Sequence, residues 1–127
     1  MTIDTLKPRY LKIKGKRMVV LPQAEFEELL RKADLWEPAM PTPDERGLYP
    51  LSVLAVIQAR DILRARRKLG LSQAELARRA GIRPETLNRI EQGRNKPSVP
   101  TIAKLDRALK EAGETQADDR VKRAAGK

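Results

Sequence analysis

The side chains in this chain that are best suited to chemistry are cations, and most of them lie in one block. Residues 52–113 carry 14 Lys and Arg against 6 Asp and Glu, so they hold +8 of the formal net charge of +10. Residues 1–51 and 114–127 contribute +1 each. Such a concentration of charge indicates an anionic partner, nucleic acid before an acidic membrane surface.

Catalytic chemistry has few candidate residues. The chain has no His and no Cys, which excludes a Ser-His-Asp triad, a thiolate nucleophile, a disulfide framework and a Cys or His zinc site. Its three serines, Ser52, Ser72 and Ser98, each stand where a helix is predicted to begin, and we interpret all three as helix caps. The carboxylates are scattered over helix faces. We therefore predict no enzyme activity, no catalytic residue, no metal and no cofactor.

Four helices are predicted between residues 52 and 113, each with its own start and stop signal. They start after Ser52, Ser72 or Ser98, or at Pro84, and they end at Gly70, Gly81, Gly93 and Gly113. Ser72 and Glu75 form a predicted capping box, in which each side chain bonds the other residue's backbone N–H. The helices therefore cover residues 53–68, 73–80, 84–92 and 99–112.

The second and third of these helices carry a pattern of small and apolar residues around a glycine. Gly81 can take the positive φ of a tight turn, and Ile82 fills the gap beside it. The residues that face inward are Leu76 and Ala77 on the first helix and Leu87 and Ile90 on the second. This pattern predicts a helix-turn-helix, in which the second helix enters the major groove of DNA.

Residues 71–82, followed by Leu87, Ile90, Glu91 and Gly93, resemble the Xre/Cro type of helix-turn-helix seen in phage repressors. Residues 97–109 are similar to that family's fourth helix. The resemblance implies a mainly α, lambda-repressor-like domain of four to five helices over residues 52–113, and it implies binding to double-stranded DNA.

The resemblance makes residues 84–92 the recognition helix. The outward positions are Arg83, Glu85, Thr86, Asn88 and Arg89. Either arginine can bond the O6 and N7 atoms of guanine, Glu85 can accept from cytosine N4, and Thr86 can meet a thymine methyl or a phosphate. The pattern departs from the family at Arg83, where a Ser or Thr cap is usual, and Pro84 supplies no polar group to a base.

Four further residues are expected to contact the DNA backbone. Gln73 matches the family position that bonds a phosphate at a helix N-terminus. The others follow the recognition helix and are Arg94, Asn95 and Lys96. In contrast, Arg66 and Glu91 match family positions that form a buried or half-buried pair, and we interpret both as structural.

The remaining segments are predicted to serve protein contacts or connection. Residues 10–14 and 18–21 read as a hairpin around Gly15-Lys16, and residues 23–32 as an amphipathic helix. Such a unit buries too little surface to be stable alone, so residues 1–33 are assigned to dimerisation or partner binding. Residues 34–51 form a Pro-rich linker, in which Trp36 and Tyr49 either dock into a nearby groove or anchor a partner protein. Residues 114–127 form a polar, frayed tail.

The N-terminal hairpin and helix resemble the N-terminal unit of Phd-type antitoxins. Fused to an Xre-type domain, such a unit implies a bacterial type II antitoxin that neutralises a small toxin and, as a homodimer, represses its own promoter at a palindromic operator. Two alternatives stay open: a stand-alone Xre-type repressor, and a protein-interaction module on a helix-turn-helix scaffold. No signal peptide or membrane span is readable, so we expect a cytoplasmic, nucleoid-associated protein.

Overall fold

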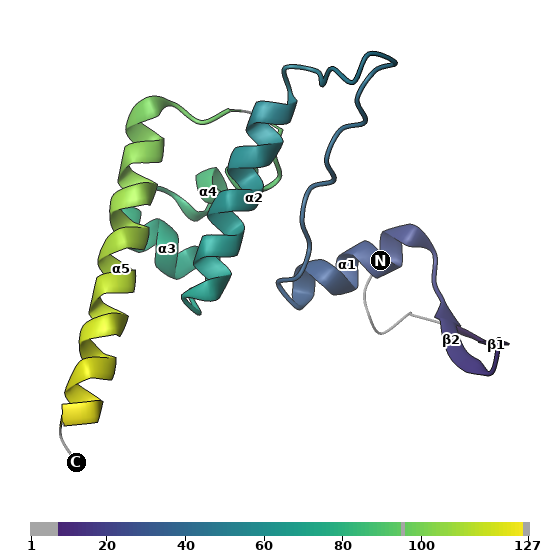
Figure 1. Ribbon diagram of the computed structural model, residues 1–127, viewed down its shortest axis with the longest axis horizontal. Helices are drawn as coiled ribbons and strands as arrows, with labels where there is room; N and C mark the ends of the chain where they lie inside the picture. Colours follow the sequence, from purple (N-terminus) through teal and green to yellow (C-terminus); the bar gives the residue numbers. More distant parts are fainter. Residues whose placement is uncertain (1–7, 95, 126–127) are drawn as a thin grey trace. The chain divides into compact units, whose positions relative to one another are not determined.

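The computed structural model describes residues 8–94 and 96–125, and the chain divides into two compact units at the Trp36–Glu37 bond. The first unit contains a two-stranded sheet and one helix, and the second contains four helices (Figure 1). The mainly α fold with a small N-terminal hairpin is therefore confirmed. None of the described helices is long and apolar enough to cross a membrane.

The first unit is a hairpin followed by a helix. Strands β1 (Arg9–Ile13) and β2 (Lys16–Val20) pair antiparallel, and every residue of both strands is exposed. The turn is formed by Lys14 and Gly15, with φ of 50° and 78°, and not by Gly15 and Lys16 as predicted. The turn lies one residue earlier than predicted because Lys14 adopts the left-handed conformation, so that β2 begins at Lys16. Helix α1 (Gln23–Lys32) has the predicted bounds.

Trp36 closes the first unit. The guanidinium carbon of Arg31 lies 4.8 Å from the centre of the Trp36 ring, and the backbone N–H of Trp36 donates to the carbonyl of Leu30 at 3.2 Å. A cation over an aromatic face is attracted by the ring quadrupole. Trp36 therefore folds back on the end of α1.

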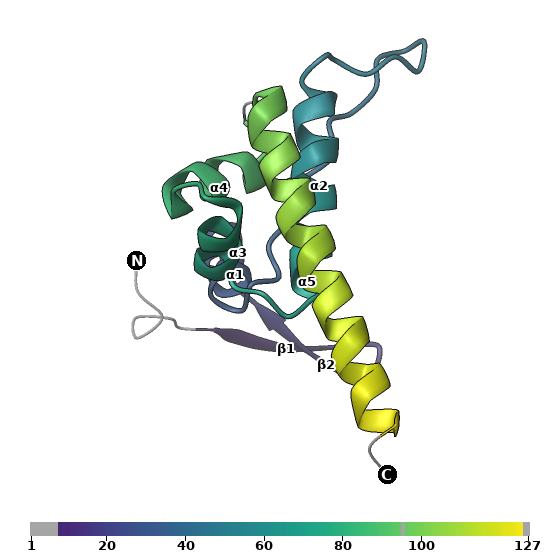
Figure 2. The same cartoon turned by 90° about the vertical axis from the view of Figure 1, so that its left-hand side faces the viewer.

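The second unit is built from α2 (Val53–Lys68), α3 (Gln73–Ala80), α4 (Pro84–Glu91) and α5 (Val99–Ala125). Helix α4 packs against α2, and α3 packs against α4 and α5 (Figure 1). Figure 2 shows α3 and α4 together on one side of α5. Their small and apolar residues meet in one core, whose most buried leucines are Leu76, Leu87 and Leu105. This core supports the segment on which the predicted DNA contacts lie.

The predicted serine caps have different outcomes. The hydroxyl of Ser72 accepts from the backbone N–H of Glu75 at 3.1 Å, and that of Ser98 accepts from Thr101 at 3.3 Å. Ser52 was predicted as a cap, but its side chain makes no capping bond, because its backbone is already helical. The carboxylate of Glu75 accepts from Arg79 at 3.2 Å, so the return bond of the capping box is absent from the described residues.

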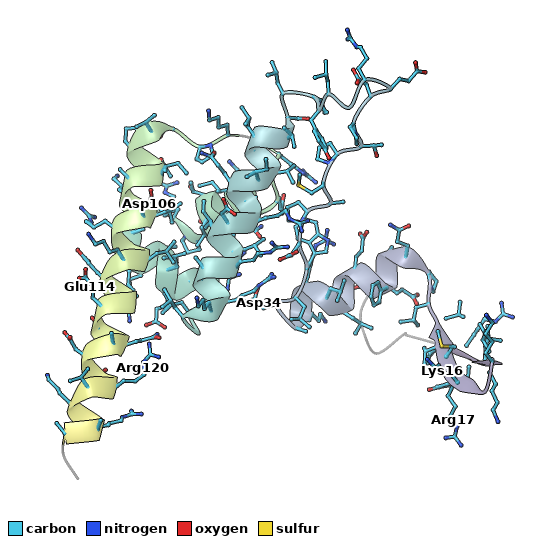
Figure 3. All side chains as sticks on the ribbon, viewed as in Figure 1. Lys16, Arg17, Asp34, Asp106, Glu114 and Arg120 are labelled. Carbon is cyan, nitrogen blue, oxygen red and sulfur yellow. The ribbon has the colours of Figure 1, made fainter. Side chains whose placement is uncertain are left out.

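Helix α5 is longer than predicted. The sequence interpretation ended it before Gly113 and left residues 114–127 as a frayed tail, but the helix continues to Ala125. A glycine inside a helix costs about 1 kcal/mol relative to alanine, and other contacts of the same helix can offset that cost. Here the Gln116 amide donates to the carbonyl of Leu69 at 2.6 Å, and Ala112 is buried. Figure 3 shows Glu114 and Arg120 on these additional turns.

Candidate nucleic-acid interface

The turn between α3 and α4 has the geometry that a helix-turn-helix requires. Gly81 ends α3 with φ of 71°, and the N–H of Ile82 donates to the carbonyl of Ala77 at 3.0 Å. Ala77 and Leu76 are fully buried, as is Leu87 on α4. The absence of a large side chain at Ala77 lets the two helices approach closely, which directs α4 outward.

Helix α4 presents its polar residues on one side. Leu87, Ile90 and Glu91 are buried, whereas Thr86 is half-buried and the remaining outward residues are exposed: Arg83, Glu85, Asn88 and Arg89. Among the described residues, neither Arg83 nor Arg89 has an ion pair or hydrogen bond. Arg83 occupies the cap position with extended backbone and without a capping side chain, and Pro84 follows at the first helical position. Both guanidinium groups are therefore available to a ligand.

Gln73 lies at the start of α3 but its side chain turns toward α4. Its amide donates to a carboxylate oxygen of Glu91 at 2.9 Å and approaches the Asn88 side-chain oxygen at 3.5 Å. The side chain thus ties the start of α3 to the end of α4. Gln73 was predicted to contact a phosphate. For that role, its amide would have to bind the phosphate while it also bonds Glu91, or the backbone N–H groups at the start of α3 would bind the phosphate instead.

Beneath this face, Arg66 and Glu91 form a buried ion pair. Arg66 has no exposed surface, and it donates to the two oxygens of Glu91 at 2.9 and 2.8 Å and to the carbonyl of Leu71 at 3.0 Å. Bidentate geometry gives such a pair its strength and direction. It connects α2 to the last turn of α4 and to the loop before α3, so it determines where the recognition helix sits.

The loop after α4 adds basic residues beside the helix. Arg94 and Lys96 are exposed, and Asn95 lies outside the described residues. An open hollow of about 200 Å³ lies between α4 and the start of α5. It is lined by five polar residues and two apolar ones: Thr86, Arg89, Lys96, Ser98 and Thr101, with Ile90 and Pro97. Two cations and three hydroxyls around such a hollow suit an oxyanion.

The sequence interpretation missed a set of contacts between residues 37–38 and α2, which we call the strap. Glu37 accepts from Arg64 at 2.7 and 3.0 Å and lies 3.5 Å from Arg60, whose guanidinium also donates to the carbonyl of Pro38 at 3.0 Å. The hydrogen bond from Arg64 and the neighbouring arginine charges lower the pKa of Glu37. Pro38 is buried. Nothing in the local sequence signals a contact across 27 residues.

Comparison with known proteins identifies the domain. A family model described as helix-turn-helix matches residues 62–114. An uncharacterized HTH-type transcriptional regulator of Methanothermobacter thermautotrophicus is 43% identical over 51 residues, which are 39% of this chain and 74% of that protein. This chain belongs to the helix-turn-helix family. No solved structure matches it significantly.

Family membership indicates a DNA-binding regulator and gives no sign of an enzyme. The match begins inside α2 and includes Arg66 and Gln73. It also includes all of the predicted DNA-contact residues in the range 83–96. It leaves outside the N-terminal unit and, of the strap, Glu37, Pro38 and Arg60. Among the described residues, no group of carboxylates is placed to hold a metal ion.

Proposed function

We propose that this protein binds a specific double-stranded DNA sequence through α4 and represses transcription from it. The observation that carries the proposal is the arrangement of α4, which buries Leu87 and Ile90. Arg83 and Arg89 are exposed beside them, and neither has a partner in the part of the chain that the structure describes. A helix of this kind fits the major groove, where base edges show a distinct pattern of donors and acceptors. The +8 charge of residues 52–113 supplies attraction to the phosphates.

The outward residues of α4 divide into base readers and helpers. Arg89 and Arg83 would each bond a guanine, Glu85 would accept from cytosine, and Asn88 would bond adenine. Thr86 lines the hollow between α4 and the start of α5, so it would contact a thymine methyl group or a phosphate. Asn88 is already oriented by Gln73, which would reduce the entropy lost when it meets a base.

Backbone contacts would come from Arg94, Asn95 and Lys96 and from the start of α3 at Gln73. The hollow between α4 and α5 has the size and chemistry for one phosphate. Six phosphate contacts per domain would give a slope of log K against log salt of about −5. Such contacts position the helix in the groove and leave sequence choice to α4.

Selection of duplexes from a random pool, followed by footprinting, tests the proposal. We expect enrichment of one short motif. If the protein acts as a homodimer, as we propose, two inverted copies will lie about one helical turn apart. Recovery of no common motif, with a salt slope near zero, would contradict DNA recognition. A footprint over a single half-site would contradict dimeric binding alone.

A second proposal concerns the partner of the N-terminal unit. We propose that the protein is the antitoxin of a toxin–antitoxin pair, that residues 1–33 provide the homodimer or toxin contact, and that the protein represses its own operon. The support is a set of apolar side chains that stay exposed in the first unit: Leu11, Ile13, Met18, Val20 and Phe26. Exposed patches of this kind mark protein interaction sites.

Co-expression with the product of the neighbouring reading frame tests the antitoxin role. We expect a stable complex, and we expect growth arrest when that product is expressed alone. Substitution of Leu11 and Met18 by Ser should prevent the complex, whereas Arg89→Ala should leave it intact. A protein that purifies without the neighbour and does not rescue growth would instead be a stand-alone repressor.

A further inference from the structure

The hairpin of the first unit carries a dense group of cations, which we call the cationic hairpin (residues 8–20). Its basic residues are Arg9, Lys12, Lys14, Lys16 and Arg17, and no Asp or Glu lies between residues 8 and 20. All five are exposed. Within the described part of the chain, none of the five forms an ion pair or a side-chain hydrogen bond. Figure 3 shows Lys16 and Arg17 projecting from the hairpin.

The near neutrality of the first 51 residues conceals this charge. Their net charge of +1 arises because acids elsewhere in the segment offset the hairpin numerically. In the structure, three of those acids contact residues outside the hairpin. Glu27 accepts from Gln23, Glu28 lies 3.9 Å from Lys32, and Glu37 binds Arg64 in the second unit. Among the described residues, no carboxylate therefore forms an ion pair with a cation of the hairpin.

The local geometry holds the cations together despite their repulsion. Lys12 lies directly opposite Arg17 across the two strands, and like charges in that position destabilise a hairpin. Lys14 adopts φ of 50°, which is unfavourable for a residue with a side chain. Four cations thus gather within six residues around the turn, in an arrangement that an isolated hairpin would not favour.

The two faces of the hairpin differ. Paired residues share a face, so Lys12 and Arg17 lie with Tyr10 and Val19. The opposite face carries Leu11 and Met18, with Arg9 and Lys16 toward its two ends. Tyr10 is 76% exposed. Residues 8–20 contain no Asn, Gln, Ser or Thr, so the side chains there offer positive charge but no amide or aliphatic hydroxyl for reading base edges.

We propose that the cationic hairpin is a second DNA-contact surface, which binds the phosphate backbone of the duplex held by α4. This inference rests on the proposed DNA binding and extends it to a unit outside the family match. A second copy of the hairpin is a poor partner, because the five positive charges of one hairpin would meet the five of the other. A two-stranded ribbon fits a DNA groove, and unpaired lysines bind phosphates as point charges.

The contact adds affinity without sequence preference. Once α4 is bound, the hairpin is linked through the chain to the same duplex, so its weak phosphate contacts form within one molecule and at a raised effective concentration. Each phosphate contact contributes about −0.9 to the slope of log K against log salt. Leu11 and Met18 lie on the face opposite Lys12 and Arg17, and they belong to the protein contact proposed above.

A salt titration with charge-matched variants tests the inference. The probe is a fluorescein-labelled duplex of 40 arbitrary base pairs, and the protein is the full chain. The hairpin variant is Lys12→Gln, Lys16→Gln and Arg17→Gln, which leaves the strained Lys14 untouched. The control removes the same charge from the end of α5, as Arg120→Gln, Lys122→Gln and Arg123→Gln.

We expect the hairpin variant to lose about 2–3 units of the salt slope and to bind roughly 100-fold more weakly at 0.1 M salt. The control should lose less than one unit. A third variant, Lys12→Arg, Lys16→Arg and Arg17→Lys, keeps the charge and should bind as the unchanged protein does. If the charge-keeping variant loses as much affinity as the neutral one, the hairpin acts structurally and the inference is wrong.

The remaining outcomes separate this inference from the proposed function. Equal slopes for the hairpin variant and the control would overturn the second contact while α4 binding stands. Loss of an acidic protein partner by the hairpin variant, with DNA binding unchanged, would also overturn it in favour of a protein ligand. Absence of any duplex binding by the unchanged chain would overturn both proposals.

Discussion

The guanidinium of Arg66 and the carboxylate of Glu91 meet through two hydrogen bonds of 2.9 and 2.8 Å, with Arg66 fully buried. Glu91 also accepts from Gln73, so one carboxylate connects α2, α3 and α4. The pair therefore holds the recognition helix from beneath, on the side opposite its exposed face.

Removal of either partner of this pair should unfold the second unit more easily. Arg66→Met or Glu91→Gln leaves a buried polar group unpaired, and the free energy of unfolding should fall by about 3–5 kcal/mol in a urea titration. The double variant Arg66→Met and Glu91→Leu should recover part of that loss, because it removes both charges. A double variant that loses as much stability as the two single changes combined would show that the two side chains are not coupled, contrary to this prediction.

The strap should give the second unit a stability that depends on pH. The pKa of Glu37 is lowered in the folded protein by its hydrogen bond from Arg64, so the contact stabilises above the unfolded pKa. That stability is lost as the pH falls through the folded pKa. We expect Glu37→Gln to lower the thermal midpoint at pH 7 and to match the unchanged protein once the pH lies below the folded pKa of Glu37. A difference that persists in acid would argue against the ion pair as its source.

Gly93 should be intolerant of alanine for two reasons that a control can separate. Its φ is 73°, and a Cβ there would lie 3.3 Å from Pro38 and from Val56. We expect Gly93→Ala to cost about 2 kcal/mol in equilibrium unfolding. Gly47 has φ of 81° but open space around it, so Gly47→Ala measures the backbone strain alone. Equal losses of unfolding free energy at both positions would mean that Pro38 and Val56 move aside without a measurable cost.

Arg89 and Lys96 should differ in what they contribute to DNA binding. On the selected sequence, Arg89→Ala should cost about 1–3 kcal/mol and relax the preference at one base pair, as measured by competition with single-base changes. Lys96→Ala should weaken binding to all sequences alike and reduce the salt slope by about 1. The reverse behaviour would exchange their assignments, with Arg89 on a phosphate and Lys96 on a base.

The amino-acid sequence alone determined the ends of most helices and the identity of the domain. Ser72, Gly81 and Pro84 act on the backbone within a few residues, so their effect is readable without the fold. The apolar spacing of Leu76, Ala77, Leu87 and Ile90 likewise follows from helical periodicity. The mainly α fold and membership of the helix-turn-helix family rested on these local signals.

The tertiary structure decided whatever depends on residues far apart in the chain. Gln116 reaches the carbonyl of Leu69 across 47 residues, which accompanies the continuation of α5 through Gly113. Glu37 meets Arg64 across 27 residues and joins the supposed linker to the second unit. The strand register sets Lys12 opposite Arg17 and so concentrates positive charge at the hairpin, which the net charge of residues 1–51 does not reveal. Local propensity and total charge cannot predict such contacts, because their energy exists only after the chain has brought the partners together.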